Sequence, residues 1–139
     1  MVDASVALKW FVPEVLSDRA TLLLDGSEDL VAPDLLWPEV GNILWKKVGL
    51  GEVRPKEARD ILASLHRTPL EVVPSGLLVD AALEIALATR LTVCDCVYVA
   101  LAVARRAVLV TADDALVRVL SGGPLRAHLA SLARWVPPS

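Results

Sequence analysis

LTVCDCVYVALAVARRAVLVTADD, residues 91–114, contains a predicted helix, a predicted strand and an acidic turn beside each. The helix is apolar on almost every side over residues 97–104, as expected of a helix inside a domain. Residues 107–110 form a short β-branched run that suits a strand covered on both faces. Asp95 enters just before the helix, and Asp113 follows the strand. Because open α/β sheets bind ligands at the carboxyl ends of their strands, the stretch predicts a carboxylate site.

The rest of the chain alternates short strand-like runs with segments of helical periodicity. Strands are expected at residues 1–2, 30–32, 71–73 and 107–110, with a possible edge strand at 134–136. Helices are expected at residues 6–11, 16–24, 35–48, 55–67, 77–89, 115–120 and 125–133. This alternation predicts an α/β domain with a mainly parallel sheet, and the length of 139 residues predicts a single domain over residues 1–139.

The composition is unusually apolar, at 55% with a mean hydropathy of +0.54. No apolar run approaches the roughly 20 residues that span a bilayer, so we expect no membrane partner. The excess instead indicates a core plus at least one exposed apolar surface, which predicts a homodimer. The four tryptophans fit either role, since Trp fills cores and is enriched at interfaces; they are Trp10, Trp37, Trp45 and Trp135.

The formal net charge of −3 argues mildly against nucleic-acid binding, although local patches matter more than totals. Cys94 and Cys96 are too close in sequence for an ordinary disulfide or a Cys-x-x-Cys motif. We interpret both as small apolar fillers in a reducing compartment. Met1 is followed at once by Val2 and Asp3, without a signal peptide, so the cytoplasm is the expected location.

Four acids stand out because each lies at a strand end or on a largely apolar element: Asp3, Glu39, Asp95 and Asp113. Helix capping is the competing explanation. Asp3 can cap the helix that follows it, and Thr92-x-x-Asp95 and Thr111-x-x-Asp114 resemble capping boxes. Capping therefore explains Asp95 and Asp114 well, but it leaves Asp113 and Glu39 unexplained.

If the fold gathers these acids, their repulsion demands a cation or shared protons. Two carboxylates about 4 Å apart repel by about 4 kcal/mol at an effective dielectric of 20, against a domain stability of only ~5–15 kcal/mol. Oxygen ligands without a nearby His or Cys select Mg²⁺ or Mn²⁺. Such a site favours metal-assisted attack of water on a phosphodiester. We see no partner for His66 or His128 in the sequence.

Four blocks of the sequence resemble the PIN domain, in particular the VapC-type toxins of toxin–antitoxin pairs. They are VDASVALKW at residues 2–10, APDLLWPEVGN at 32–42, TVCDCVYVALA at 92–102 and LVTAD at 109–113. The resemblance implies a three-layer α/β/α sandwich with a mainly parallel central sheet. It also implies a Mg²⁺- or Mn²⁺-dependent endoribonuclease that acts on RNA, forms a homodimer and is inhibited by a VapB-like antitoxin.

By motif position, the resemblance makes Asp3 and Asp95 the main metal ligands, completed by Glu39 and Asp113. Further residues are expected around them: Ser5 and Thr111 as hydroxyl partners of the carboxylates, and Asn42 at the border of the pocket. RNA would be held partly by Lys46, Arg54, Arg105 or Arg106, each of which is otherwise an ordinary surface charge. Cys94 and Cys96 depart from the family, which often has Tyr and Ala there.

Two other hypotheses remain open at this stage. The acidic pI of about 5.3 and the high apolar content suit a catalytically inactive PIN-like module that only binds proteins. Asp3-x-Ser5 after a first strand is also compatible with a phosphatase that uses Asp3 as its nucleophile, although that chemistry usually has a second Asp at the position of Ser5.

Overall fold

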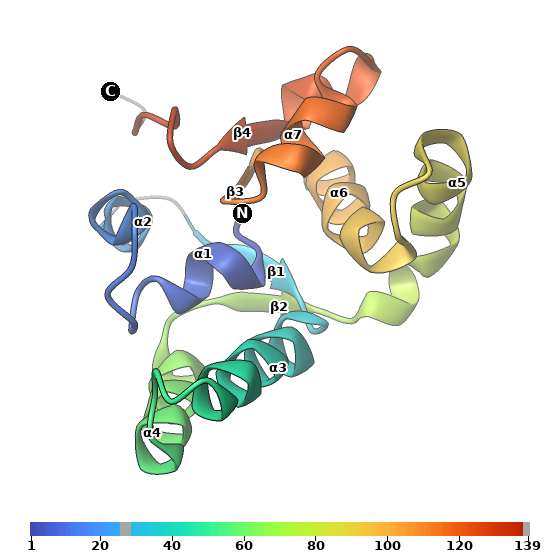
Figure 1. Cartoon of the computed structure of the whole chain (residues 1–139). Coiled ribbons are helices and arrows are strands. Elements are labelled where there is room, and N and C mark those ends of the chain that lie inside the picture. Colours follow the sequence, from blue (N-terminus) through green and yellow to red (C-terminus); the bar gives the residue numbers. More distant parts are fainter. Residues whose placement is uncertain (26–28, 138–139) are drawn as a thin grey trace.

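The computed structural model describes residues 1–25 and 29–137 (Figure 1). Its strands are β1 (Val31–Pro33), β2 (Glu71–Val73), β3 (Leu109–Thr111) and β4 (Leu129–Ser131). Its α-helices are α1 (Ala4–Leu8), α2 (Ser17–Leu24), α3 (Leu36–Gly49), α4 (Pro55–Arg67), α5 (Val79–Thr89), α6 (Val93–Arg105) and α7 (Asp114–Leu120). Short 3-10 helices occupy η1 (Ser75–Leu77) and η2 (Pro124–His128). The predicted bounds of α4 and β2 are confirmed without change.

All strand pairing in the described residues is parallel. β1 pairs with β2 and β3 with β4, while Val2 forms a parallel bridge with Val110 on the other side of β3. Neighbouring residues of each strand enter different cores: Val31 and Leu109 pack into one, and Ala32 and Val110 into the other. Because side chains alternate between the two faces of a strand, helices must cover both faces. The predicted α/β/α arrangement with parallel strands is therefore confirmed.

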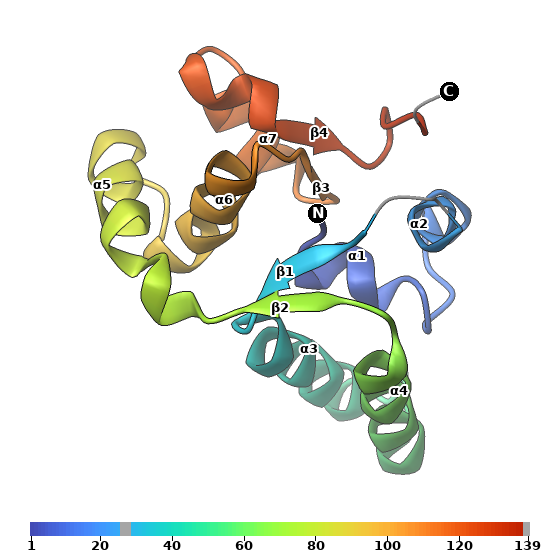
Figure 2. The ribbon, with the colours of Figure 1, turned by 180° about the vertical axis from the view of Figure 1, so that it is seen from behind.

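Each face of the strands has its own set of helices (Figure 2). Side chains of α1, α2, α3 and α4 build one core, and those of α5, α6 and α7 build the other. Helix α6 is buried continuously from Cys96 to Ala102, as expected. Its last turn is not, since Val103 is 39% exposed, so the prediction of a helix buried through residue 104 is wrong at that end.

An ion-pair network joins the C-terminal ends of α1 and α3. The carboxylate of Glu14, in the loop after α1, lies 3.3 Å from Lys9 Nζ through one oxygen and 3.3 Å from Lys47 Nζ through the other. Lys47 also pairs with Glu52 at 3.2 Å. The Lys9 side chain is only 10% exposed, so this network fixes two helices that both carry acids of the site described below.

The C-terminal prediction is wrong. Residues 125–133 were expected to be helical and residues 134–136 to form an edge strand, but the chain makes one 3-10 segment and then β4 at Leu129–Ser131. Pairing with β3 decides this segment: Leu129 contacts the core around α6, Ala130 contacts the other, and Leu132 is fully buried. Tertiary packing here overrides a weak helical preference.

Several apolar side chains remain at the surface. Trp45 is 70% exposed, whereas the other three tryptophans are partly buried. Cys96 is buried as expected, but Cys94 is exposed, so the prediction that both are core fillers is wrong for Cys94. No single helix in residues 1–25 and 29–137 is long and apolar enough to cross a membrane; only α5 and α6 taken together, bent by 114°, reach that length and composition.

Candidate active site

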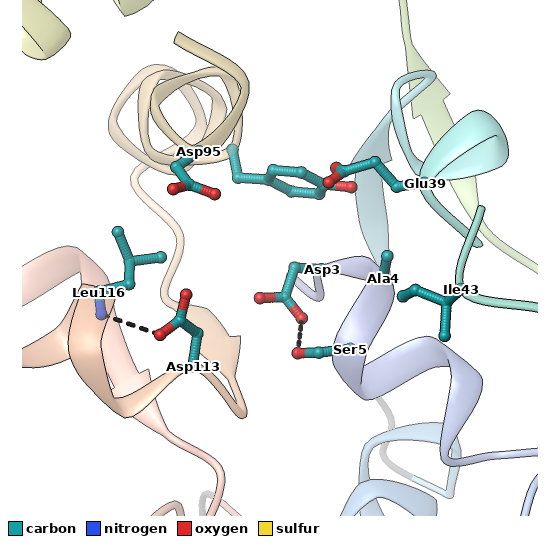
Figure 3. Close-up of a pocket in the computed structure, with 9 residues that line it drawn as sticks. Asp3, Ala4, Ser5, Glu39, Ile43, Asp95, Asp113 and Leu116 are labelled. Carbon is teal, nitrogen blue, oxygen red and sulfur yellow. Dashed lines mark hydrogen bonds between the residues drawn. The ribbon is translucent and has the colours of Figure 1, made fainter. Parts of the chain in front are cut away.

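The four predicted acids line one cavity of about 150 Å³. They come from four separate parts of the chain: the residue before α1, the first turn of α3, the first turn of α6 and the residue before α7. Figure 3 shows the carboxylates of Asp3, Asp95 and Asp113 pointing toward one another, and Glu39 lines the same cavity. The remaining lining residues are Ala4, Ser5, Ile43, Tyr98 and Leu116.

Asp3 is held by hydrogen bonds to both of its carboxylate oxygens. Oδ1 accepts from the Val6 backbone N–H at 3.1 Å, which makes Asp3 the N-cap of α1, and from the Ser5 hydroxyl at 2.5 Å. Oδ2 accepts from the hydroxyl of Thr111, which lies at the end of β3. The predicted hydroxyl partners are thus placed as expected, and capping and a site role coexist at Asp3.

Thr111 connects two of the acids. Its side chain is fully buried, and its hydroxyl oxygen also accepts from the Asp113 N–H at 3.0 Å. Thr111 does not cap α7. Asp113 does, because its Oδ1 accepts from the Ala115 and Leu116 N–H groups at 3.0 and 3.2 Å. The predicted capping box from Thr111 to Asp114 is therefore wrong, and Asp113, left unexplained by capping, is the cap.

Asp95 lies in the first turn of α6. Its backbone N–H donates to Thr92 Oγ1 at 3.2 Å, so Thr92 caps α6, but the Asp95 carboxylate does not complete the predicted capping box. The Asp95 carboxylate has no hydrogen bond or ion pair within the described part of the chain. No hydrogen bond or ion pair in the described residues therefore fixes the orientation of the Asp95 carboxylate.

Glu39 is partly buried against Tyr98. Burial raises the pKa of Glu39, and the charges of Asp3 and Asp95 raise it further. Glu39 Oε1 and the Tyr98 hydroxyl are both buried without a hydrogen-bond partner among the described residues. Burial and the Glu39 carboxylate together raise the pKa of Tyr98, so its hydroxyl stays protonated.

Opposing effects also act on the pKa of Asp3. Burial raises the pKa of its carboxyl group, and the charge of Asp113 adds to the rise. The hydrogen bonds from Ser5, Thr111 and the Val6 N–H lower it. The fold therefore brings together acids that repel one another, and it stabilises the ionised form of Asp3 by hydrogen bonds alone.

A divalent cation fits this donor set. None of the four acids forms an ion pair with a Lys or Arg of the described residues, and Glu39 Oε1 is a buried oxygen without a donor. Oxygen donors of this kind suit Mg²⁺ or Mn²⁺. Within residues 1–25 and 29–137, however, no three acidic, His or Cys side chains are close enough to form a ready ligand cluster. The four acids line one cavity without converging into a ligand cluster, so their assignment as metal ligands stays a prediction.

Other predicted residues lie away from this cavity. Asn42 is exposed and does not line it, because the helix turns Ile43, four residues after Glu39, toward the cavity instead. Lys46, Arg54, Arg105 and Arg106 do not line it either. Arg54 pairs with Glu57 and Arg105 with Glu71, whereas Lys46 borders a separate apolar groove with Trp45, Gly49 and Leu50, and Arg106 ends α6.

Sequence reasoning missed Tyr98, but it was right not to place the two histidines in the site. Tyr98 follows Asp95 by three residues, and that spacing on a helix is the signal that could have found it. His66 stacks on Trp37 with ring centroids 4.4 Å apart, and His128 Nδ1 lies 3.0 Å from the Ala107 carbonyl oxygen. Both therefore have partners, although neither lines the cavity.

Known proteins are similar to this chain in sequence and in fold. The PIN domain family model matches residues 1–120. The chain is 36% identical to Ribonuclease VapC3 of Pyrobaculum aerophilum over 104 residues, which are 73% of this chain and 79% of that protein. Its structure is similar to the crystal structure of PAE2754 from Pyrobaculum aerophilum, with a TM-score of 0.66, 26% sequence identity and coverage of 95% of this chain and 82% of that one. This chain therefore belongs to the PIN domain family.

Proposed function

We propose that the protein is a Mg²⁺- or Mn²⁺-dependent endoribonuclease, the toxin component of a VapBC-type toxin–antitoxin pair. The observation that carries this proposal is the cavity lined by Asp3, Glu39, Asp95 and Asp113 without a basic partner in the described residues. Similarity to a protein named Ribonuclease VapC3 supports the choice of RNA as substrate. A catalytically inactive binding module would not need four acids whose carboxylates repel one another.

Asp3 and Asp95 are the proposed main ligands, and Glu39 and Asp113 complete the set directly or through water. A bound divalent cation would supply the charge that activates a water molecule and stabilises the phosphodiester oxygens. Hydrogen bonds from Ser5 and Thr111 orient the Asp3 carboxylate and oppose the rise in its pKa that burial causes. A phosphatase that uses Asp3 as its nucleophile is disfavoured because Ser5 stands where that chemistry usually has a second Asp.

The proposed partners are RNA, a VapB-like antitoxin and a second copy of the chain, in the cytoplasm. Among the proposed RNA-binding side chains, Lys46 and Arg106 form no salt bridge within the described residues, whereas Arg54 and Arg105 do. Lys46 and Arg106 are therefore the more available to phosphates.

A matched pair of variants tests the proposal. Asp113→Asn should lower the rate of cleavage of a fluorescent RNA pool at least 100-fold in 5 to 10 mM Mg²⁺, a drop typical of losing one group of a catalytic unit. Asn caps helices as well as Asp, so α7 should be retained. Asp114→Asn is the control, because Asp114 accepts from Ser131 Oγ outside the cavity.

Asp3→Asn and Asp95→Asn should likewise abolish cleavage, as should excess EDTA. Circular dichroism spectra that match the wild type would show that the fold is retained. Undiminished cleavage by Asp113→Asn, or in EDTA, would contradict the proposed chemistry. Absence of both cleavage and saturable Mn²⁺ binding in the wild type would favour the inactive binding module.

A further inference from the structure

The Tyr98 hydroxyl is a buried donor that has no acceptor among the described residues. Tyr98 is only 3% exposed, and it lines the cavity of the four acids. It lies in α6 three residues after Asp95, so the two side chains share one face of that helix. Native proteins satisfy nearly all of their buried polar groups, so an unpartnered hydroxyl in the wall of a candidate active site requires an explanation.

The acceptor that matches this donor belongs to Glu39, in the first turn of α3. Glu39 Oε1 is likewise buried without a hydrogen-bond partner in residues 1–25 and 29–137. The other acids offer no such atom. Both oxygens of Asp3 and one oxygen of Asp113 already accept hydrogen bonds, and the oxygens of Asp95 are not among the buried, unpartnered atoms. The cavity wall thus holds a donor without an acceptor and an acceptor without a donor.

The chemistry of a phenol limits what Tyr98 can do in this cavity. A tyrosine keeps its proton at neutral pH, so it can donate a hydrogen bond. Hard cations prefer carboxylate and carbonyl oxygens, so a neutral phenol is a poor ligand beside four carboxylates. Tyr98 and Glu39 are close enough to interact electrostatically. Donation to Glu39 is therefore the role that both the chemistry and the placement favour.

We propose that Tyr98 is a positioning residue for Glu39. When a divalent cation is bound, the Tyr98 hydroxyl donates to one oxygen of Glu39 and leaves the other oxygen to the cation, directly or through water. This inference rests on the metal-dependent function proposed above. A partner that holds a ligand rather than the metal fixes the orientation of that ligand, and losing such a partner typically weakens metal binding by about 10–100-fold.

The metal-free protein provides the first test. Tyr98→Phe removes the hydroxyl and keeps the buried ring. Because the hydroxyl has no hydrogen bond in the described residues, its loss should leave the midpoint of urea unfolding within about 0.5 M of the wild type or raise it. A larger fall in the midpoint would show that the hydroxyl supports the fold itself, and it would overturn the proposed role.

Calorimetric titration with Mn²⁺ alone provides the second test. Tyr98→Phe should bind Mn²⁺ about 10–100-fold more weakly than the wild type. In a Glu39→Gln background the same change should alter the affinity by less than about threefold, because Glu39 transmits the effect. Leu101→Met is the matched control, since Leu101 is a buried residue of the same helix that does not line the cavity. Its affinity should stay within about twofold of the wild type.

The outcomes separate this inference from the function on which it rests. A wild type without saturable Mn²⁺ binding would overturn both. A wild type that binds Mn²⁺ and cleaves RNA, together with a Tyr98→Phe variant of unchanged affinity, would overturn the role of Tyr98 alone. So would a loss of affinity that persists in full in the Glu39→Gln background, because Tyr98 would then act through a different group.

Discussion

Replacing Thr111 with valine should destabilise the metal-free protein by about 2–4 kcal/mol at neutral pH. The Thr111 side chain is fully buried, and valine has nearly its shape, so the change leaves no cavity. It removes the hydroxyl that donates to the Asp3 carboxylate, a charged hydrogen bond worth ~1.5–3 kcal/mol, and the acceptor of the Asp113 N–H, worth ~1 kcal/mol.

The penalty should depend on pH in a direction fixed by Asp3. The Thr111 hydroxyl lowers the pKa of Asp3 against the burial that raises it, so the valine variant has a still higher folded-state pKa. The part of the destabilisation that comes from the lost hydrogen bond to the Asp3 carboxylate applies only while Asp3 is ionised. This part is complete at a pH above the folded-state pKa of Asp3 in both proteins. It disappears as the pH falls until Asp3 is protonated in both.

Urea unfolding followed by tryptophan fluorescence measures this cost. With a slope of about 1–3 kcal/mol/M, the midpoint should fall by roughly 1–2 M at pH 7.5 with the slope unchanged. Thr111→Ser keeps the hydroxyl and loses one buried methyl group, so it should cost only ~1 kcal/mol. A valine variant whose unfolding free energy lies within 0.5 kcal/mol of the wild type would refute the role assigned to the hydroxyl. So would a serine variant that is as strongly destabilised as the valine variant at every pH.

Three further predictions concern the charges around the site. Burial and neighbouring acids raise the folded-state pKa of Glu39, so wild-type stability should fall as the pH rises through that value; Glu39→Gln should be more stable by about 1 kcal/mol at pH 8 and unchanged at pH 4 in urea unfolding. Mn²⁺ at 100 times its dissociation constant should stabilise the wild type by about 2.7 kcal/mol in calorimetric melting, and Asp95→Asn by much less. Glu14→Gln should lower the unfolding free energy by about 1–3 kcal/mol because it leaves the partly buried Lys9 unpaired and removes one of the two partners of Lys47, whereas Glu52→Gln, at 53% exposure, should change it by less than ~0.5 kcal/mol.

Local periodicity and breaker residues predict most of the fold. Residues 55–67 begin with a proline in the first helical turn and carry a clear amphipathic pattern, so α4 is predicted without error. Residues 129–131 have no such signal. They become a strand because β3 offers them a pairing partner, and that choice depends on contacts distant in sequence.

The meeting of Asp3 and Asp113 was predictable because both follow parallel-paired residues whose carboxyl ends lie at one edge. The hydrogen-bond partners of these acids were only partly predictable from the sequence. Which residue caps α7 depends on where β3 ends, and this places Thr111 inside the core and leaves the cap to Asp113. Asn42 is exposed and does not line the cavity, whereas Ile43, the next residue along α3, does.

The most direct test of the central claim is anomalous diffraction at the manganese edge from crystals soaked in Mn²⁺. The account predicts a peak inside the cavity, ligated by Asp3 and Asp95 with Glu39 or Asp113 adjacent, and no peak there in Asp95→Asn crystals. A wild-type cavity without a peak at a Mn²⁺ concentration that supports RNA cleavage, or a peak on other side chains only, would contradict it.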